Sequence, residues 1–299
     1  MLRNMKDLEN YAIRATDGNI GHVKDFYFDD EAWVVRYLVV ETGTWLSSRK
    51  VLISPIAIGQ LNWADKIPPV SITREQVKNS PDIDTDKSVS RQHEMQYLGY
   101  YGYPYYWAGD GLWGQGAYPG MMLMGLGDGG SDAAYRHAQA EDARAEVEGG
   151  QAGDPHLRSC KALMRYHIEA TDGGIGHVQG LLLDEETWAI RYVIVDTSNW
   201  WLGHQVLIAP QWIDDISWPD ATVSVNLTQQ AVKDAPPYDS AVPLNRDQEM
   251  GLYKHHGRTG YWADQVNLEN PQYHAVASTS QGANQKLRDI VTQDKRHSL

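Results

Sequence analysis

The nonapeptide ATDGNIGHV at residues 15–23 returns almost unchanged as ATDGGIGHV at residues 170–178. In both copies the Asp-Gly pair is a tight-turn signal, because glycine adopts a positive φ at little steric cost. Alternating apolar residues follow in HVKDFYFDD at 22–30, which is typical of a strand. We interpret the phrase as one hairpin that two units both need, built from the repeated turn residues Asp17, Gly18, Gly21, His22, Asp172, Gly173, Gly176 and His177.

The similarity extends far beyond the nonapeptide. Placing residue n beside residue n + 155 (15 beside 170) aligns residues 15–107 with 170–262 without a gap, and large aromatic residues coincide along the alignment. This period exceeds the roughly 20–50 residues of solenoid repeats. Each copy is long enough to bury a core of its own. The sequence therefore indicates a duplication of whole domains.

Short strands and turns alternate within each copy. The β-branched runs VVRYLVVET at 34–42 and KVLISP at 50–55 predict further strands. Turn signals about every 8–12 residues are typical of a small barrel or sandwich. Thr73 and Gln76 form a capping-box signal, and Asn245 is a favoured N-cap for a later helix. Each copy is predicted to be mainly β, with one or two short helices at its end.

This order of a DGxxGHV turn, an acid-ended strand, VVRYLVVET and KVLISP resembles the PRC-barrel domain. That family is named for the cytoplasmic domain of the photosynthetic reaction-centre H subunit, and the tandem layout is similar to that of stand-alone bacterial two-barrel proteins. The resemblance implies two tandem small antiparallel β-barrels that act as docking or scaffolding modules without catalytic residues. The boundaries that we predict are 1–107 for the first domain, 108–158 for a glycine-rich, aromatic and then helical linker, 159–263 for the second domain, and 264–299 for a polar C-terminal tail.

Composition narrows the classes of partner. The formal charge of −13 disfavours binding to the phosphate backbone of nucleic acids and to anionic lipid surfaces, so no nucleic-acid partner is expected. The first residues, MLRNMKDLENYAIR, lack the apolar segment of a secretory signal, and the most apolar run, at 119–127, is too short to span a bilayer. We therefore expect a cytoplasmic protein without a membrane span of its own.

The histidines and acidic clusters that could bind metal ions are more simply interpreted as structural or solvated residues. His22 and His177 supply one histidine per copy, which is too few for a structural zinc site. The acidic clusters at 29–31 and 184–186 lack the EF-hand spacing and are predicted to be solvated turns. No catalytic, cofactor-binding or metal-binding residue is therefore predicted.

Two further features fit the same interpretation. The stretch GLGDGG at 125–130 matches G-x-G-x-x-G, but no predicted strand precedes it. Cys160 is the only cysteine, which rules out a disulfide within the chain. It is predicted to be an inert thiol.

Tryptophans are the best candidates for contacts, because they dominate interface energetics. We predict that Trp45, Trp200 and Trp201 mediate contact between the barrels or with a partner, and that the unrepeated Trp113 and Tyr118 face a partner. Either an intramolecular pseudo-dimer of barrels or a homodimer would bury the two similar faces.

The predicted function is a non-enzymatic protein-binding or scaffolding module that docks on a larger assembly, with an unknown protein partner. Three alternatives stay open at this point. One is an accessory protein of a photosynthetic or respiratory electron-transfer complex. Another is a ribosome-assembly factor. The last is a carboxylate- or metal-dependent enzyme.

Overall fold

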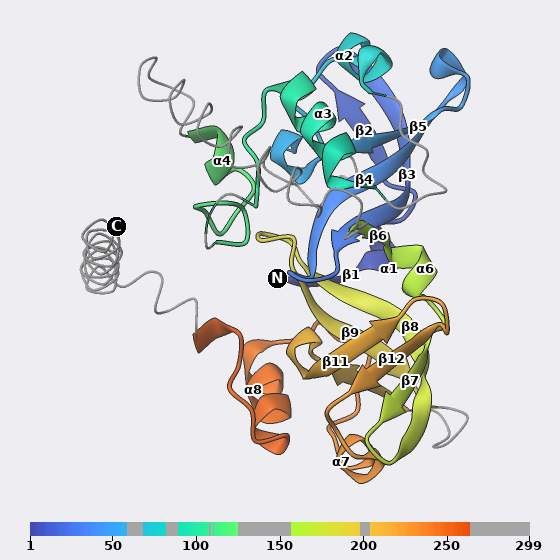
Figure 1. Ribbon diagram of the computed structural model, residues 1–299, viewed down its shortest axis with the longest axis vertical. Coiled ribbons are helices and arrows are strands. Elements are labelled where there is room, and N and C mark those ends of the chain that lie inside the picture. The colour runs from blue at the N-terminus through green and yellow to red at the C-terminus, as the bar shows by residue number, and fades with distance from the viewer. Residues whose placement is uncertain are drawn as a thin grey trace, which may run out of the picture. The chain divides into compact units, whose positions relative to one another are not determined.

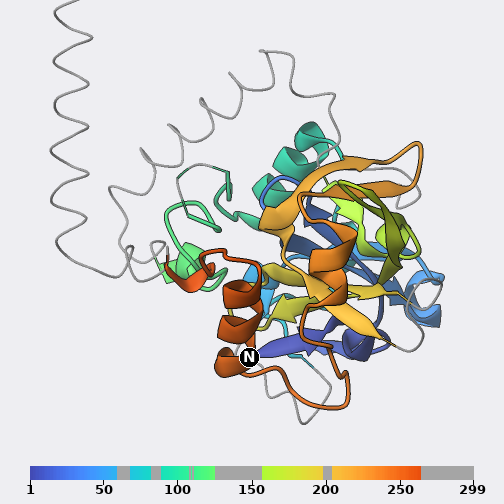
Figure 2. The same ribbon diagram turned by 90° about the horizontal axis from the view of Figure 1, so that it is seen from below.

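The computed structural model describes residues 1–58, 68–81, 89–107, 109, 111–124, 157–197 and 204–263. The chain divides into two compact units, Met1–Pro243 and Leu244–Leu299. The first unit contains both β-sheets (Figure 1, Figure 2). The second unit contributes α8 (Arg246–His255), which begins with a capping box between Asn245 and Gln248. Below, residues 1–124 are called the first half of the large unit and residues 157–243 its second half.

The first sheet is antiparallel and is centred on two long, buried strands. Its order is β2 (Ala12–Ala15), β3 (Gly18–Asp29), β4 (Val34–Thr42) and β5 (Lys50–Ile53). The β-branched run of β4 is buried along almost its whole length, which is typical of a strand covered on both faces. The short helices of this half are α1 (Met5–Leu8), η1 (Thr44–Leu46), η2 (Pro55–Ala57), α2 (Arg74–Asn79), α3 (Arg91–Tyr101) and α4 (Met121–Met124). The predicted capping box of Thr73 and Gln76 is confirmed at the start of α2.

The second sheet repeats this core and extends it. Its order is β10 (Gln205–Ile208), β9 (Ile190–Asp196), β8 (Gly173–Asp184), β7 (His167–Ala170), β12 (Thr222–Val225) and β11 (Ile213–Ser217). Only the β7–β12 pair is parallel. The helices of this half are α6 (Cys160–Leu163), η5 (Pro210–Trp212) and α7 (Gln229–Lys233).

The two halves exchange their first strands. β1 (Leu2–Asn4) precedes the first sheet in the chain but pairs with β8 of the second, with Leu2 opposite Asp184. β6 (Leu157–Ser159) precedes the second sheet but pairs with β3 of the first, with Leu157 opposite Asp29. Leu2 and Leu157 are repeat counterparts, and so are Asp29 and Asp184. The exchange of strands is therefore reciprocal. The halves are therefore joined as the two subunits of a strand-swapped dimer would be.

A second set of contacts crosses between the halves at their centre. Val34 forms an antiparallel bridge with Ala189, its own repeat counterpart. The amide of Val35 donates to the carbonyl oxygen of Trp188 at 2.8 Å, and the amide of Ile190 donates to that of Trp33 at 2.7 Å. Residues that pair with their own counterparts lie on a twofold axis, so the large unit has an internal pseudo-twofold axis at Val34 and Ala189.

The predicted fold class is confirmed in part. The chain is mainly β with few, short helices. Two tandem closed barrels are not confirmed, because neither sheet closes on itself within the described residues. Among the strands that the structure describes, the end strands of each sheet are not paired with one another, and β1 and β6 pair with the sheet of the other half. The predicted boundaries stay predictions, and most of the predicted linker and all of the tail lie outside the described residues.

Candidate functional site

The repeated aspartates hold the start of a helix in each half. Asp17 Oδ1 accepts a hydrogen bond from the Arg74 amide at 2.8 Å, and Asp172 Oδ1 accepts one from the Gln229 amide at 2.7 Å. Arg74 and Gln229 are the first residues of α2 and α7. A helix leaves its first amides without partners inside the helix, so each aspartate satisfies one of them.

Gly21 and Gly176 occupy positions where the backbone leaves no room for a side chain. A Cβ on Gly21 would lie 1.9 Å from the carbonyl oxygen of Glu41, and one on Gly176 would lie 2.0 Å from that of Asp196. Both glycines stand where the backbone of the long hairpin strand lies close against that of the neighbouring strand. Gly18 and Gly173 have φ values of 147° and 139°, which disfavour any side chain.

The two repeated histidines lie at the surface of this hairpin. His22 is exposed, and His177 is half-buried with its Nε2 3.9 Å from Asp196 Oδ2. Among the described residues, no three His, Cys, Asp or Glu side chains are grouped to hold a metal ion.

An ion pair occupies the same place in both halves, buried in the first and partly buried in the second. Arg36 Nη2 lies 3.3 Å from Asp29 Oδ2, and Arg191 Nη2 lies 3.3 Å from Asp184 Oδ2. The prediction of a solvated acidic turn is wrong for Asp29, which is only 6 % exposed. It is buried because its other carboxylate oxygen accepts from the Ala32 amide at 3.0 Å while the arginine balances its charge.

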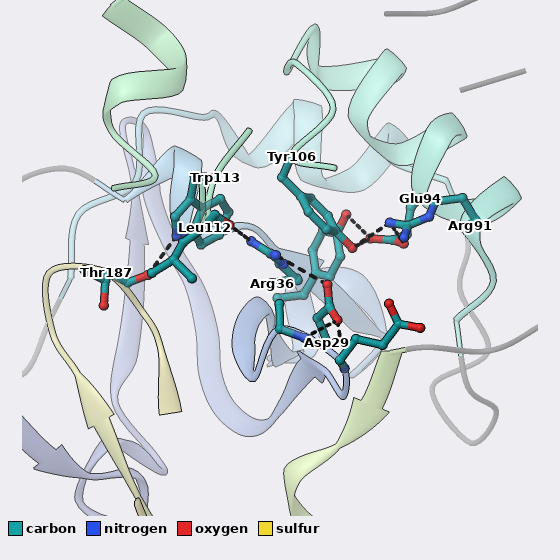
Figure 3. A network of polar contacts seen from close by, with 11 residues as sticks. Asp29, Arg36, Arg91, Glu94, Tyr106, Leu112, Trp113 and Thr187 are labelled. Atoms are coloured by element: carbon teal, nitrogen blue, oxygen red, sulfur yellow. Dashed lines mark hydrogen bonds and ion pairs between the residues drawn. The ribbon is translucent and has the colours of Figure 1, made fainter. Parts of the chain in front are cut away.

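Tyr106 and the start of the predicted linker cover this ion pair in the first half (Figure 3). The Arg36 guanidinium lies 3.8 Å from the ring centre of Tyr106 and 4.9 Å from that of Trp113. Arg36 Nη1 also donates to the carbonyl oxygen of Leu112 at 2.5 Å. Cation–π contacts gain strength away from water, so these rings stabilise the charge where it is buried.

Trp113 carries the contact into the second half. Its Nε1 donates to the carbonyl oxygen of Thr187 at 2.7 Å, and the side chain is 1 % exposed. We predicted that Trp113 faces a partner, but its indole is buried inside the chain. The segment after α3 therefore helps to hold the two halves together.

Glu94 of α3 completes the network. Its buried carboxylate accepts from the hydroxyls of Tyr106 at 2.5 Å and Tyr37 at 3.2 Å, and it lies 3.3 Å from Arg91. Burial, and then the negative charge of Glu94, raise the pKa of Tyr37 and Tyr106 well above the usual tyrosine range. Both phenols therefore remain donors at neutral pH. Tyr37 ties α3 to β4, and Tyr106 ties the segment after α3 to the same carboxylate.

The other predicted interface residues are placed as follows. Trp45 is half-buried, with its Nε1 donating to the carbonyl oxygen of Ile20 at 2.6 Å and the Arg74 guanidinium 4.2 Å from its ring. Tyr118 is 36 % exposed. Trp200 and Trp201 lie outside the described residues.

The comparison with known families bears on the first half. Residues 3–67 match the family model of the PRC-barrel domain. The matched segment begins in β1 and runs through β2 to β5 and η2, so it includes the strand that is donated to the other sheet. The resemblance noted from the sequence is thereby confirmed. A search of curated proteins finds no match to the chain. Within the part of the chain that the structure describes, none of the helices is long and apolar enough to cross a membrane.

Sequence reasoning missed the exchanged strands, although a signal was present. The stretch LRNMKDL at 2–8 aligns with LRSCKAL at 157–163 at the same spacing of n + 155. The repeat therefore starts earlier than residue 15. Its first three residues are the exchanged strands β1 and β6.

Proposed function

We propose that this protein is a non-enzymatic scaffold in which two PRC-type halves act as one rigid docking body. The PRC-barrel match is the observation that carries the proposal, because it suggests a protein-interaction module. Strand exchange and the buried Arg36 network support it, since they give a partner a surface of constant shape. Burial also raises the pKa of the Cys160 thiol well above its usual range, which disfavours a nucleophilic role for it.

The docking surface that we propose centres on Tyr118 and Met121. Both side chains are exposed, at 36 % and 47 %, and they belong to one turn, in which the Met121 amide donates to the carbonyl oxygen of Tyr118 at 3.1 Å. This turn follows directly after the buried Trp113. An exposed aromatic and a methionine on an anchored segment are residue types enriched in interface cores.

The test is affinity capture of the tagged full-length chain from its native host after mild cross-linking. The double variant Tyr118→Ala/Met121→Ala should lose a stoichiometric partner. Val242→Ala, which truncates an equally exposed apolar side chain at 48 %, should retain it. Equal capture by all three proteins would refute this surface, and the absence of any protein partner would refute the scaffold.

The identity of the captured assembly would separate the finer alternatives. Membrane electron-transfer subunits would favour the accessory role, and ribosomal proteins would favour the assembly role.

A further inference from the structure

Residues of both halves line a cleft of about 330 Å³. They come from the region where α1 packs on β8 and α6 packs on β3. Both exchanged segments contribute to it, because α1 follows β1 and α6 follows β6. Its volume falls at the lower end of the range for small-molecule sites in proteins.

The two halves differ at this cleft. Asp25 in β3 accepts hydrogen bonds from Ser159 Oγ at 2.5 Å and from the Lys161 amide at 3.1 Å, and so fixes the start of α6. Its repeat counterpart is Gly180 in β8, which has no side chain to offer to α1. The carboxylate that pseudo-symmetry would place beside α1 is therefore missing, and Gly180 lines the cleft instead.

The rim of the cleft is cationic although the chain is acidic overall. Lys6, Lys161 and Arg165 line it, and all three are exposed. The side chains of Lys6 and Arg165 form no ion pair within the part of the chain that the structure describes. Two carboxylates also line the cleft. That of Asp25 is bonded to α6, which leaves Glu9 as the only other acidic group among the lining residues.

The floor of the cleft is apolar. Met5 is 5 % exposed, Cys160 4 % and Leu181 1 %, and all three line the cleft. An apolar floor beneath a cationic rim complements a molecule that has a hydrocarbon body and one acidic head. A free anion such as chloride would leave the floor uncovered.

We propose that this cleft binds a small amphipathic carboxylate. Its head group meets Lys6, Lys161 and Arg165 through charge-assisted hydrogen bonds, and its apolar body lies on Met5, Cys160 and Leu181. Since the ligand touches α1 and α6 together, it binds the joined halves and stabilises their junction by mass action. This site is independent of the proposed docking surface at Tyr118 and Met121.

The experiment titrates octanoate into the full-length protein, with octanol and octylamine as probes of equal chain length. Binding is followed by calorimetry and by NMR of labelled methionine methyl groups. Octanoate should shift the methyl resonances of Met5 and Met164, which line the cleft, and leave that of the exposed Met250 unchanged. The other two probes should bind about tenfold more weakly or not at all, because they cannot make the charge-assisted contacts.

Three variants test the location. Lys6→Glu/Lys161→Glu should weaken octanoate binding by about tenfold or more. Gly180→Asp, which places in the second half the residue found at the equivalent position of the first, should also weaken binding, because it adds a negative charge to the cleft. Lys233→Glu changes the charge of an exposed lysine on α7, away from the cleft, and should leave the affinity unchanged.

Three results would overturn the proposal. The first is octanol binding as tightly as octanoate. The second is octanoate failing to bind at about 10 mM, roughly ten times the dissociation constant of a millimolar ligand. The third is an equal loss of affinity in Lys233→Glu and in the lysine pair. The capture experiment tests only the scaffold proposal, so its outcome is independent of the outcome of the octanoate titration.

Discussion

Leu157 offers a sharp test of the strand exchange. It is fully buried, lies in β6 and pairs with Asp29 of the other half. Truncation of a buried leucine to alanine costs about 2–5 kcal/mol, depending on how far the surroundings collapse into the space. We expect Leu157→Ala to lower the free energy of unfolding of the large unit by about 3 kcal/mol. For a unit of this size, that corresponds to a fall in Tm of roughly 6–12 °C.

The location of the effect matters as much as its size. In the chain Leu157 precedes the second sheet, but its side chain belongs to the core of the first. We therefore expect amide hydrogen exchange to accelerate in β3 and β4 as well as in β8 and β9, with a single unfolding transition in urea. Its counterpart Leu2 is only half-buried, so Leu2→Ala should cost less, about 1–2 kcal/mol.

Acceleration confined to residues after 157 would refute this reasoning. So would two separate unfolding transitions, because they would mean that each half folds without the strand donated by the other. Val242→Ala, at an exposed position, serves as the control and should leave both measurements unchanged.

Three further outcomes are expected. Gly176→Ala should lower the free energy of unfolding by about 3 kcal/mol or more in chemical denaturation, since its Cβ would lie 2.0 Å from the Asp196 carbonyl oxygen. The control Gly99→Ala has open space in α3 and should raise the free energy of unfolding by up to about 1 kcal/mol. Similar values for the two variants would contradict the steric argument. Burial raises the pKa of Asp25 above its ordinary 3.8, so the folded state holds this proton more tightly and stability falls as pH rises through that window. The stability of the wild type relative to Asp25→Asn should therefore decline from about pH 3.5 upward and then level off. If the urea midpoints of the two proteins ran parallel across this pH range, the argument from the Asp25 pKa would be wrong. Burial likewise raises the pKa of the Cys160 thiol, so iodoacetamide at about pH 8 should modify it at least about tenfold faster in urea than in buffer; equal rates by mass spectrometry would mean that the thiol is accessible in the folded state.

The buried Arg36 network shows where sequence reasoning reaches its limit. Arg36 and Arg191 coincide in the repeat, and so do Asp29 and Asp184, but coincidence does not show that they pair. The residue type of Trp113 predicts a contact residue, and the contact that it makes lies inside the chain. Whether a tryptophan meets its own chain or another depends on the path of the segment that carries it.

The duplication, the β-rich composition and the PRC-type hairpin can be read from the sequence alone. An Asp-Gly turn, glycines where two strands lie close together and β-branched runs each act over a few residues, and the same pattern occurs twice at a spacing of n + 155. Three features are evident only in three dimensions: β1 and β6 change places, the halves share a pseudo-twofold axis at Val34 and Ala189, and Gly180 lines a cleft whereas its counterpart Asp25 fixes a helix. Three-residue strands such as LRN and LRS carry no information about which sheet will accept them. The choice depends on contacts between residues more than a hundred positions apart in the chain, and these exist only once both sheets have formed.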